Sequence, residues 1–451
     1  MNKLFKITTS ILILLLLLIA GFYFLLFFTP VGSTLAEPYI KKELEEKIGM
    51  PIDIKALDLG YETANLTFSI NEQAQVNLAL LHYDLSDEKY EGSYQIKTDA
   101  FAYGKKRLNN ADINGSFKYM PEEIYLQGEG TALDAEVDYR VSIIDNLPQQ
   151  ILLNIKDAQL SEALQLAGKP DIAEGKIDVK VNIPDMAGDR EEIYGYIDLK
   201  KSYFKPEKVK ELYDFTVPAK SYLHGRIDGN LEGENVKLVG ALQSNLFVLK
   251  IKEALVSMFT EDWSAKYDLD VKDMRILTKN KLAGALDLRG DIKGVGKRLE
   301  GKASSTSLDG NLHFSVYQIA NVTFDHIALE KMLVLLKQPV YAKGRVNGTA
   351  SLKWYPSASA KVGKVLSWHE WSYAAYDMRI DKGVLTTKAR EALDKYDIPA
   401  KNRFSLYTKG KIAHKKLTSN ATITSTLADV KFSSLNYDFK KKILTSNYNL
   451  E

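Results

Sequence analysis

Side chains that could perform catalysis or bind metal are few and scattered in this 451-residue sequence. There is no cysteine, which excludes a disulfide framework, thiolate catalysis and cysteine-ligated metal. The six histidines form no HExxH or other paired-ligand spacing. The sequence also lacks a P-loop, a GxGxxG motif and a Gly-x-Ser-x-Gly turn. We therefore assign no catalytic residue, no metal ligand and no cofactor, and an enzyme is the least favoured class.

Two acidic residues and one tryptophan cluster remain as candidates for chemistry. Asp268 and Asp270 alternate on one face of an expected strand and could bind a cation or transfer protons. The same spacing is typical of the solvated face of a sheet, which is the interpretation that we prefer. The cluster Trp368-His-Glu-Trp371 is more typical of packing or of contact with a membrane interface than of a catalytic site.

The charge balance and the linker content limit the possible partners and the domain organisation. Lysine and arginine total 60 against 58 acidic residues, and there is no arginine-rich segment, so no nucleic-acid partner is expected. No Pro/Gly/Ser-rich linker divides the chain, which predicts one elongated body.

The N-terminus is expected to anchor the chain in a membrane. Residues 7–36 carry no charge, and the apolar run is long enough for a transmembrane helix at residues 10–29. Lys3 and Lys6 precede this run, whereas the first charge after it is Glu37, so residues 1–9 are predicted to be cytoplasmic and the remainder exported. A cleaved signal peptide is the alternative, but the apolar run continues to Phe28, which favours an uncleaved anchor.

A short amphipathic helix is predicted at residues 33–48. Ile40, Leu44 and Ile48 share one face, Thr34-Leu-Ala-Glu37 could form a capping box, and Gly49 is placed to end the helix. We expect the apolar face to cap the start of the following module, although a solvated surface helix has the same pattern.

From residue 50 to residue 451 the apolar period changes from 3.6 to 2, which predicts strands with one apolar and one polar face. Such alternation is typical of antiparallel sheet. Ten residues represent the predicted apolar face: Val137, Tyr139, Val141, Ile177, Val179, Val181, Ile183, Tyr267, Leu269 and Val271.

Short helical patterns interrupt the strands at residues 160–167, 209–215, 328–336 and 389–396. Glycines that begin similar strands fall at 175, 225, 284 and 344, which gives intervals of 50, 59 and 60 residues. We interpret this as an internal repeat of a short helix and several strands, with units near 155–205, 206–270, 271–325 and 326–400. Chance recurrence of a glycine-initiated strand is the alternative.

These features together resemble the AsmA-like family of bacterial envelope proteins, relatives of TamB and of chorein-type bridge proteins that carry lipids. The resemblance lies in the anchor, in the helix from Leu35 to Ile48 followed by Gly49-Met-Pro-Ile-Asp-Ile54, and in the phrase from Ile155 to Pro170 that leads into Gly175-Lys-Ile-Asp-Val179. It implies a mainly β fold with short helices, in which a curved antiparallel sheet forms a groove or taco-like repeats. It also implies a periplasmic body held by an inner-membrane helix, and a role in lipid traffic to the outer membrane and in envelope integrity.

The alternation alone does not separate a groove from a packed sandwich, because both have the same hydrophobic pattern. The resemblance favours a groove in which the ten apolar residues face phospholipid or another acyl-chain lipid. The alternative function is an assembly factor that chaperones outer-membrane proteins through exposed strand edges.

Overall fold

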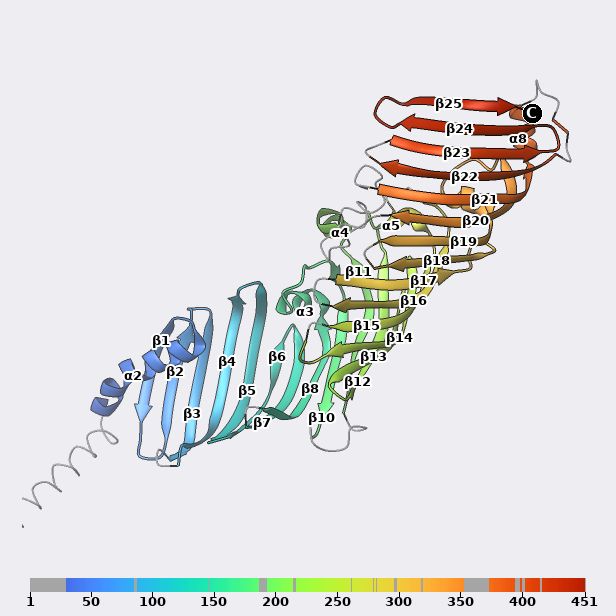
Figure 1. Ribbon diagram of the computed structural model, residues 1–451. Coiled ribbons are helices and arrows are strands. Elements are labelled where there is room, and N and C mark those ends of the chain that lie inside the picture. The colour runs from blue at the N-terminus through green and yellow to red at the C-terminus, as the bar shows by residue number, and fades with distance from the viewer. Residues whose placement is uncertain are drawn as a thin grey trace, which may run out of the picture. The chain divides into compact units, whose positions relative to one another are not determined.

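The structure is a computed structural model of the chain (Figure 1). It describes the following residues: 30–84, 87–145, 147–185, 193–213, 216–260, 262–278, 280, 282–295, 298–317, 319–352, 373–393, 398–399, 402–413 and 416–450. Within these ranges the fold is mainly β, with 25 strands of antiparallel sheet and a few short helices, which confirms the predicted fold class at this level.

The predicted transmembrane helix at residues 10–29 lies outside the described residues. Among the helices that the structure does describe, none has the length and apolar character needed to cross a membrane.

Two compact units divide the chain, Met1–Ser202 and Tyr203–Glu451. The elements that begin in unit 1 are, in chain order, α2 (Pro30–Ile48), β1 (Ile52–Leu59), β2 (Ala64–Ile70), β3 (Ala74–Asp84), β4 (Lys89–Tyr103), β5 (Lys106–Met120), β6 (Glu123–Ala132), β7 (Ala135–Ile144), β8 (Leu147–Gln159), α3 (Leu160–Leu166), β9 (Ala173–Glu174), β10 (Lys176–Ile183) and β11 (Tyr194–Phe204). Each strand from β1 to β7 pairs with the next, β8 pairs with β10, and β10 pairs with β11. Figure 1 shows β1 to β8 side by side in one layer.

Unit 2 has the same simple order of strands. Its elements are α4 (Pro206–Tyr213), β12 (Tyr222–Glu232), β13 (Asn235–Ser244), β14 (Phe247–Ser257), β15 (Trp263–Val271), α5 (Met274–Leu277), β16 (Leu286–Val295), β17 (Arg298–Ser305), β18 (Asn311–Val316), β19 (Ala320–Ala328), α6 (Leu329–Leu335), β20 (Ala342–Leu352), β21 (Tyr373–Leu385), α8 (Thr387–Ala392), β22 (Arg403–Ala413), β23 (Lys416–Ser425), β24 (Asp429–Asp438) and β25 (Ile443–Leu450). Every strand from β12 to β25 pairs antiparallel with its successor.

The helices within each unit connect to the sheet at the same edge, which is formed by the ends of the strands, for a reason that follows from strand direction. Successive strands of an antiparallel sheet run in opposite directions, so an even number of strands returns the chain to the edge from which it started. Eight strands, β1 to β8, separate α2 from α3 in unit 1, and four, four and two strands separate α4, α5, α6 and α8 in unit 2. We call this edge, which is formed by strand ends, the helix edge of each unit. The edge formed by the opposite ends of the strands is its hairpin edge.

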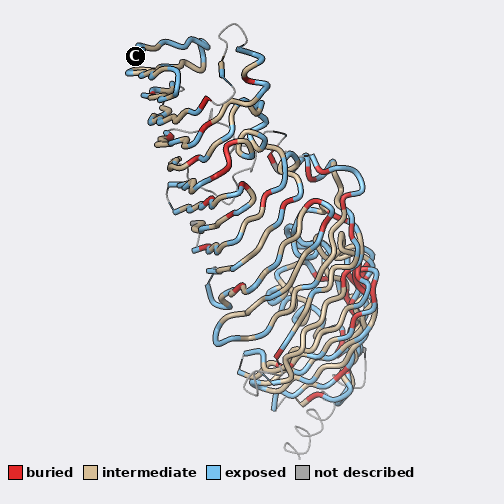
Figure 2. The backbone as a smooth tube through the Cα atoms, turned by 90° about the vertical axis from the view of Figure 1, so that its right-hand side faces the viewer, coloured by how far each residue is buried: buried red, intermediate tan, exposed pale blue. Residues whose placement is uncertain are grey.

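Buried residues gather near these helices, and most of the remaining sheet is partly or fully exposed (Figure 2). Leu160 and Ala163 of α3 pack on a cluster that includes Ala158, and α6 packs on a cluster that includes Ile327 and Val346. The core is therefore a series of local clusters along the sheet.

Helix α2 confirms the predicted apolar face, because Ile40, Leu44 and Ile48 pack against the first strands of the sheet. Its described length begins at Pro30, so Thr34 lies inside the helix and the predicted capping box is wrong. Gly49 follows the helix with φ of 71° and donates its N–H to the Glu45 carbonyl, as expected of a terminating glycine.

The predicted helical patterns correspond to α3, α4, α6 and α8. The glycines that follow are structurally required at two places. Gly175 and Gly225 have φ of 143° and 145°, and a Cβ atom would collide with Ser202 in the first case and with the Ala241 carbonyl in the second.

Candidate functional site

The apolar face of unit 1 brings seven of the ten predicted residues onto neighbouring strands. In the register of β7, β8 and β10, Val137 aligns with Ile155 and Val179, and Tyr139 aligns with Leu153 and Val181. The third row contains Val141, Ile151 and Ile183. Residues that sequence reasoning placed on separate strands therefore form one continuous apolar surface, to which β8 adds a third strand.

The other three predicted residues lie on β15 and belong to unit 2. Leu269 aligns with Leu249 and Leu288, and Tyr267 aligns with Ile251 and Gly290. Unit 2 thus has its own apolar face, built by the same alternation.

Burial differs along each strand of these faces. Ile177, Val137 and Val271 are only 6%, 8% and 4% exposed and belong to the packed core near the helix edge. Val179 contacts the cluster around Ala158 on which α3 packs. Three other predicted residues, Val141, Val181 and Ile183, are only partly buried and lie outside this cluster. A ligand on this face could reach the middle rows but not the row beside the helices.

A row of two tyrosines and two glycines crosses the middle of the unit 1 face. Tyr94 on β4 is aligned with Gly115 on β5, which is aligned with Gly128 on β6 and Tyr139 on β7. The two phenol groups meet in a hydrogen bond, and Tyr94 also donates to the Gln127 carbonyl at 3.2 Å.

The glycines make this arrangement possible. A Cβ atom on Gly115 would collide with the Tyr94 hydroxyl, and one on Gly128 would lie 2.9 Å from the Tyr139 ring. The rings therefore lie across the glycine backbone and cover it with apolar surface. Burial of the phenol, and then its hydrogen bond with Tyr139, raise the pKa of Tyr94 above its usual range, which favours the neutral phenol on this face.

Sequence reasoning missed Tyr94, Gly115 and Gly128. The available signal was glycine at an apolar position of an alternating strand, which often marks close approach by another group. It did not identify the partner, because that depends on register across four strands.

The opposite face of unit 1 is polar and carries paired charges. Lys97 lies 3.0 Å from Asp112, and Lys200 lies 3.0 Å from Asp178. Asp178 also accepts the backbone N–H of Asp157 at 2.7 Å, so it is part of a polar network on this face.

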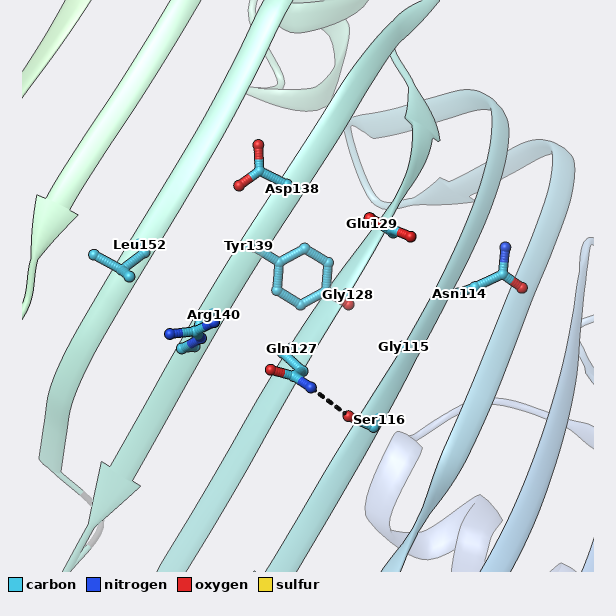
Figure 3. Close-up of a pocket in the computed structure, with 10 residues that line it drawn as sticks. All are labelled: Asn114, Gly115, Ser116, Gln127, Gly128, Glu129, Asp138, Tyr139, Arg140 and Leu152. Carbon is cyan, nitrogen blue, oxygen red and sulfur yellow. Dashed lines mark hydrogen bonds between the residues drawn. The ribbon is translucent and has the colours of Figure 1, made fainter.

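A shallow hollow of about 590 Å³ opens over β5, β6 and β7 (Figure 3). The side chains on its polar side include Glu129, Asp138 and Arg140, and Gln127 donates to the Ser116 hydroxyl at 3.0 Å. Among the described residues no group of three or more histidines and acids could hold a metal ion, and this hollow adds no catalytic constellation.

The two aspartates considered for chemistry are placed on the polar face of β15. Asp268 forms an ion pair with Lys252 at 2.8 Å, and Asp270 is exposed. Residues 368–371, the tryptophan cluster, lie outside the described residues.

No family model, no curated protein and no solved structure matches the chain. A function is therefore inferred from the geometry of the sheet.

Proposed function

We propose that this chain binds or conducts phospholipids along the apolar face of its sheet. In this proposal it is an AsmA-like protein with an inner-membrane anchor at residues 10–29 and a periplasmic body that supports lipid homeostasis of the outer membrane. No catalytic step is part of the proposal.

One observation carries it: the rows of the unit 1 apolar face away from the helix edge are aligned across neighbouring strands and remain partly exposed. The row of Phe117, Leu126, Val141, Ile151 and Ile183 extends from β5 to β10, and each of these side chains is only partly buried. In a packed sandwich a second sheet would bury such a row. An exposed apolar surface of this extent marks a binding site for apolar ligands or partners.

The opposite face supports the proposal because it gives the sheet a water-facing side. Its aspartates and lysines are paired, so the same strands can remain solvated on one side while the other side contacts acyl chains.

The direct test is the lipid content of the purified full-length chain, measured by mass spectrometry of an organic extract. We expect copurifying phospholipid. Val141→Asp places a carboxylate in the apolar row, which costs several kcal/mol unless the group takes up a proton. This variant should therefore contain about threefold less lipid than the wild-type protein. Lipid-free wild-type protein would contradict the proposal.

Arg140→Asp is the matched control, because Arg140 is the preceding residue of β7, is exposed and lies on the polar side. It should leave the lipid content unchanged. Thermal melting of both variants separates loss of lipid from loss of fold. If Val141 lies in a packed interior, the Val141→Asp variant should unfold, whereas on an open face it should remain folded.

A second candidate function, assembly of outer-membrane proteins, is favoured by strand β25. It pairs with β24, and no described strand pairs with its other side. Leu444, Tyr448 and Leu450 are 60%, 72% and 62% exposed. Crosslinking from a photoreactive residue at Tyr448 to a nascent barrel, in protein that contains no lipid, would favour this function over lipid binding.

A further inference from the structure

The hairpin edge of unit 2 carries a concentration of exposed apolar side chains that the lipid-binding proposal does not use. Three successive hairpins, β14–β15, β16–β17 and β18–β19, turn at this edge. We call their exposed apolar residues the hairpin rim: Val256 (39% exposed), Met258 (45%), Phe259 (74%), Trp263 (38%), Val295 (46%), Tyr317 (60%) and Ile319 (45%).

Register makes these residues neighbours. Trp263 is aligned with Val256 on one side and with Gly294 on the other, and a Cβ atom on Gly294 would collide with the indole ring. The indole therefore lies across the second hairpin and joins the first two hairpins of the rim. β17 and β18 continue the sheet to the third hairpin, so the rim follows the edges of six strands, about 24 Å at 4.8 Å per step.

Hydrogen bonds hold the described backbone of the β14–β15 turn around Met258 and Phe259. The Ser257 hydroxyl accepts the N–H of Phe259 at 3.2 Å and that of Thr260 at 3.1 Å. Met258 donates its N–H to the Glu234 carbonyl of the neighbouring hairpin at 3.1 Å. Phe259 at the tip is consequently presented to solvent and is not a residue of a frayed segment.

Three lysines beside the rim are paired within the sheet. Lys237 lies 2.8 Å from Glu232, Lys266 lies 3.1 Å from Glu253, and Lys293 lies 2.8 Å from Glu300. These lysines therefore do not offer unpaired positive charge that would select an anionic partner.

We propose that the hairpin rim of unit 2 docks on the surface of a lipid bilayer by inserting these side chains at the interface. A long, shallow line of separate tips fits a fluid surface better than it fits a pocket of a folded partner, because lipids adapt to each tip. Tryptophan and tyrosine are enriched at the level of lipid headgroups, and phenylalanine and methionine supply apolar contact below it. The paired charges indicate that zwitterionic lipid suffices.

The rim also continues the apolar face of unit 2. Val256 and Trp263 lie on the same side of the sheet as Ala265 and Ile292, by the register of β14 to β16. Docking at this edge would thus place a bilayer beside the open side of that face, opposite the helices. Docking of the rim on a membrane does not require lipid on the apolar face.

The experiment uses the full chain, which contains no cysteine, so that one introduced cysteine carries a unique fluorophore. Ile319→Cys is labelled at the rim, and Leu427→Cys, 53% exposed at the β23–β24 turn on the helix edge, is the control. Both proteins are combined with vesicles of phosphatidylcholine that has brominated acyl chains. The bromine atoms quench a fluorophore that enters the bilayer. We expect quenching at position 319 and none at position 427.

Phe259→Ser in the Ile319→Cys protein should lower the equilibrium constant for docking about tenfold, since burial of one aromatic side chain changes this constant by roughly that factor or more. Leu427→Ser in the same background should leave quenching unchanged, and circular dichroism should be the same for all variants. Absence of quenching at position 319, equal quenching at both positions, or no response to Phe259→Ser would each overturn the proposal. Quenching that requires anionic lipid or disappears in high salt would overturn the neutral-bilayer assignment.

Discussion

Strands β1 and β25 each have a sheet partner on one side only among the described residues, yet the chain treats their other sides differently. Along β1 lies helix α2, whose Glu45 and Ser33 side chains accept the backbone N–H groups of Ile52 at 3.0 Å and Leu59 at 3.1 Å. No described strand pairs with the other side of β25, and Tyr448 is 72% exposed. A helix thus satisfies backbone donors that an open strand would offer to other chains.

Protection of the edge strand β1 depends on two kinds of interaction. Apolar packing holds α2 on the sheet, through Ile40, Leu44 and Ile48, while the two side-chain acceptors at opposite ends of β1 fix its direction along the strand. β25 has neither, so its stability depends on β24 alone.

The largest effect should come from the packed side of the comparison. Ile52 is 2% exposed at the start of β1, and Ile52→Ala should reduce the local free energy of opening by about 3 kcal/mol through lost burial and a residual cavity. Leu444→Ala in β25, at a position 60% exposed, should change it by less than about 0.5 kcal/mol. Native-state hydrogen exchange measures both, and equal effects would mean that the two edges are held alike.

An intermediate effect is expected from loss of the hydrogen bond that α2 accepts from β1. Glu45→Ala removes the acceptor of the Ile52 N–H and should destabilise this edge by about 1 kcal/mol. Glu46→Ala is the control, because Glu46 is exposed and its ion pair with Lys42, at 3.8 Å, contributes about 0.3 kcal/mol. Faster exchange of the β1 amides in the first variant alone would support the proposed capping.

The smallest effect concerns the turn that connects β24 to β25. Its Asp438 carboxylate accepts the N–H groups of Lys441 and Lys440 at 3.0 Å and 2.9 Å, and these bonds lower the pKa of Asp438 below 3.8. Because the folded pKa lies below the unfolded one, the stabilisation is present above the unfolded value and is lost as pH falls through the folded value.

The turn should therefore open first in acid, seen as increased exchange of residues 438–443 after correction for intrinsic rates. Asp438→Asn should remove this acid dependence, and a turn that opened equally in both proteins would exclude the carboxylate as its cause.

The strands could be predicted from sequence because each one alternates apolar and polar side chains locally. Val137 to Val141 and Ile177 to Ile183 needed no knowledge of their partners to be identified as strands with one apolar face. Gly49 at the end of α2 was likewise a local signal.

What could not be predicted depends on pairing between strands. The contact between Tyr94 and Tyr139 requires the register of β4 through β7, and local periodicity carries no information about register. Thr34 failed as a helix cap because the described helix already begins at Pro30, which a four-residue motif does not reveal. The position of α2 along β1 depends on Ser33 and Leu59, 26 residues apart, which no local pattern connects.

The even number of strands between helices has a consequence for how such a chain can change in length. Removal or duplication of one hairpin shifts everything after it by two strand spacings, about 9.6 Å, yet keeps every later helix on its edge and every apolar side chain on its face. Removal of a single strand would reverse the direction of all that follows and move the later helices across the sheet. The hairpin is thus the smallest increment by which insertion or deletion can lengthen or shorten this architecture without rebuilding it.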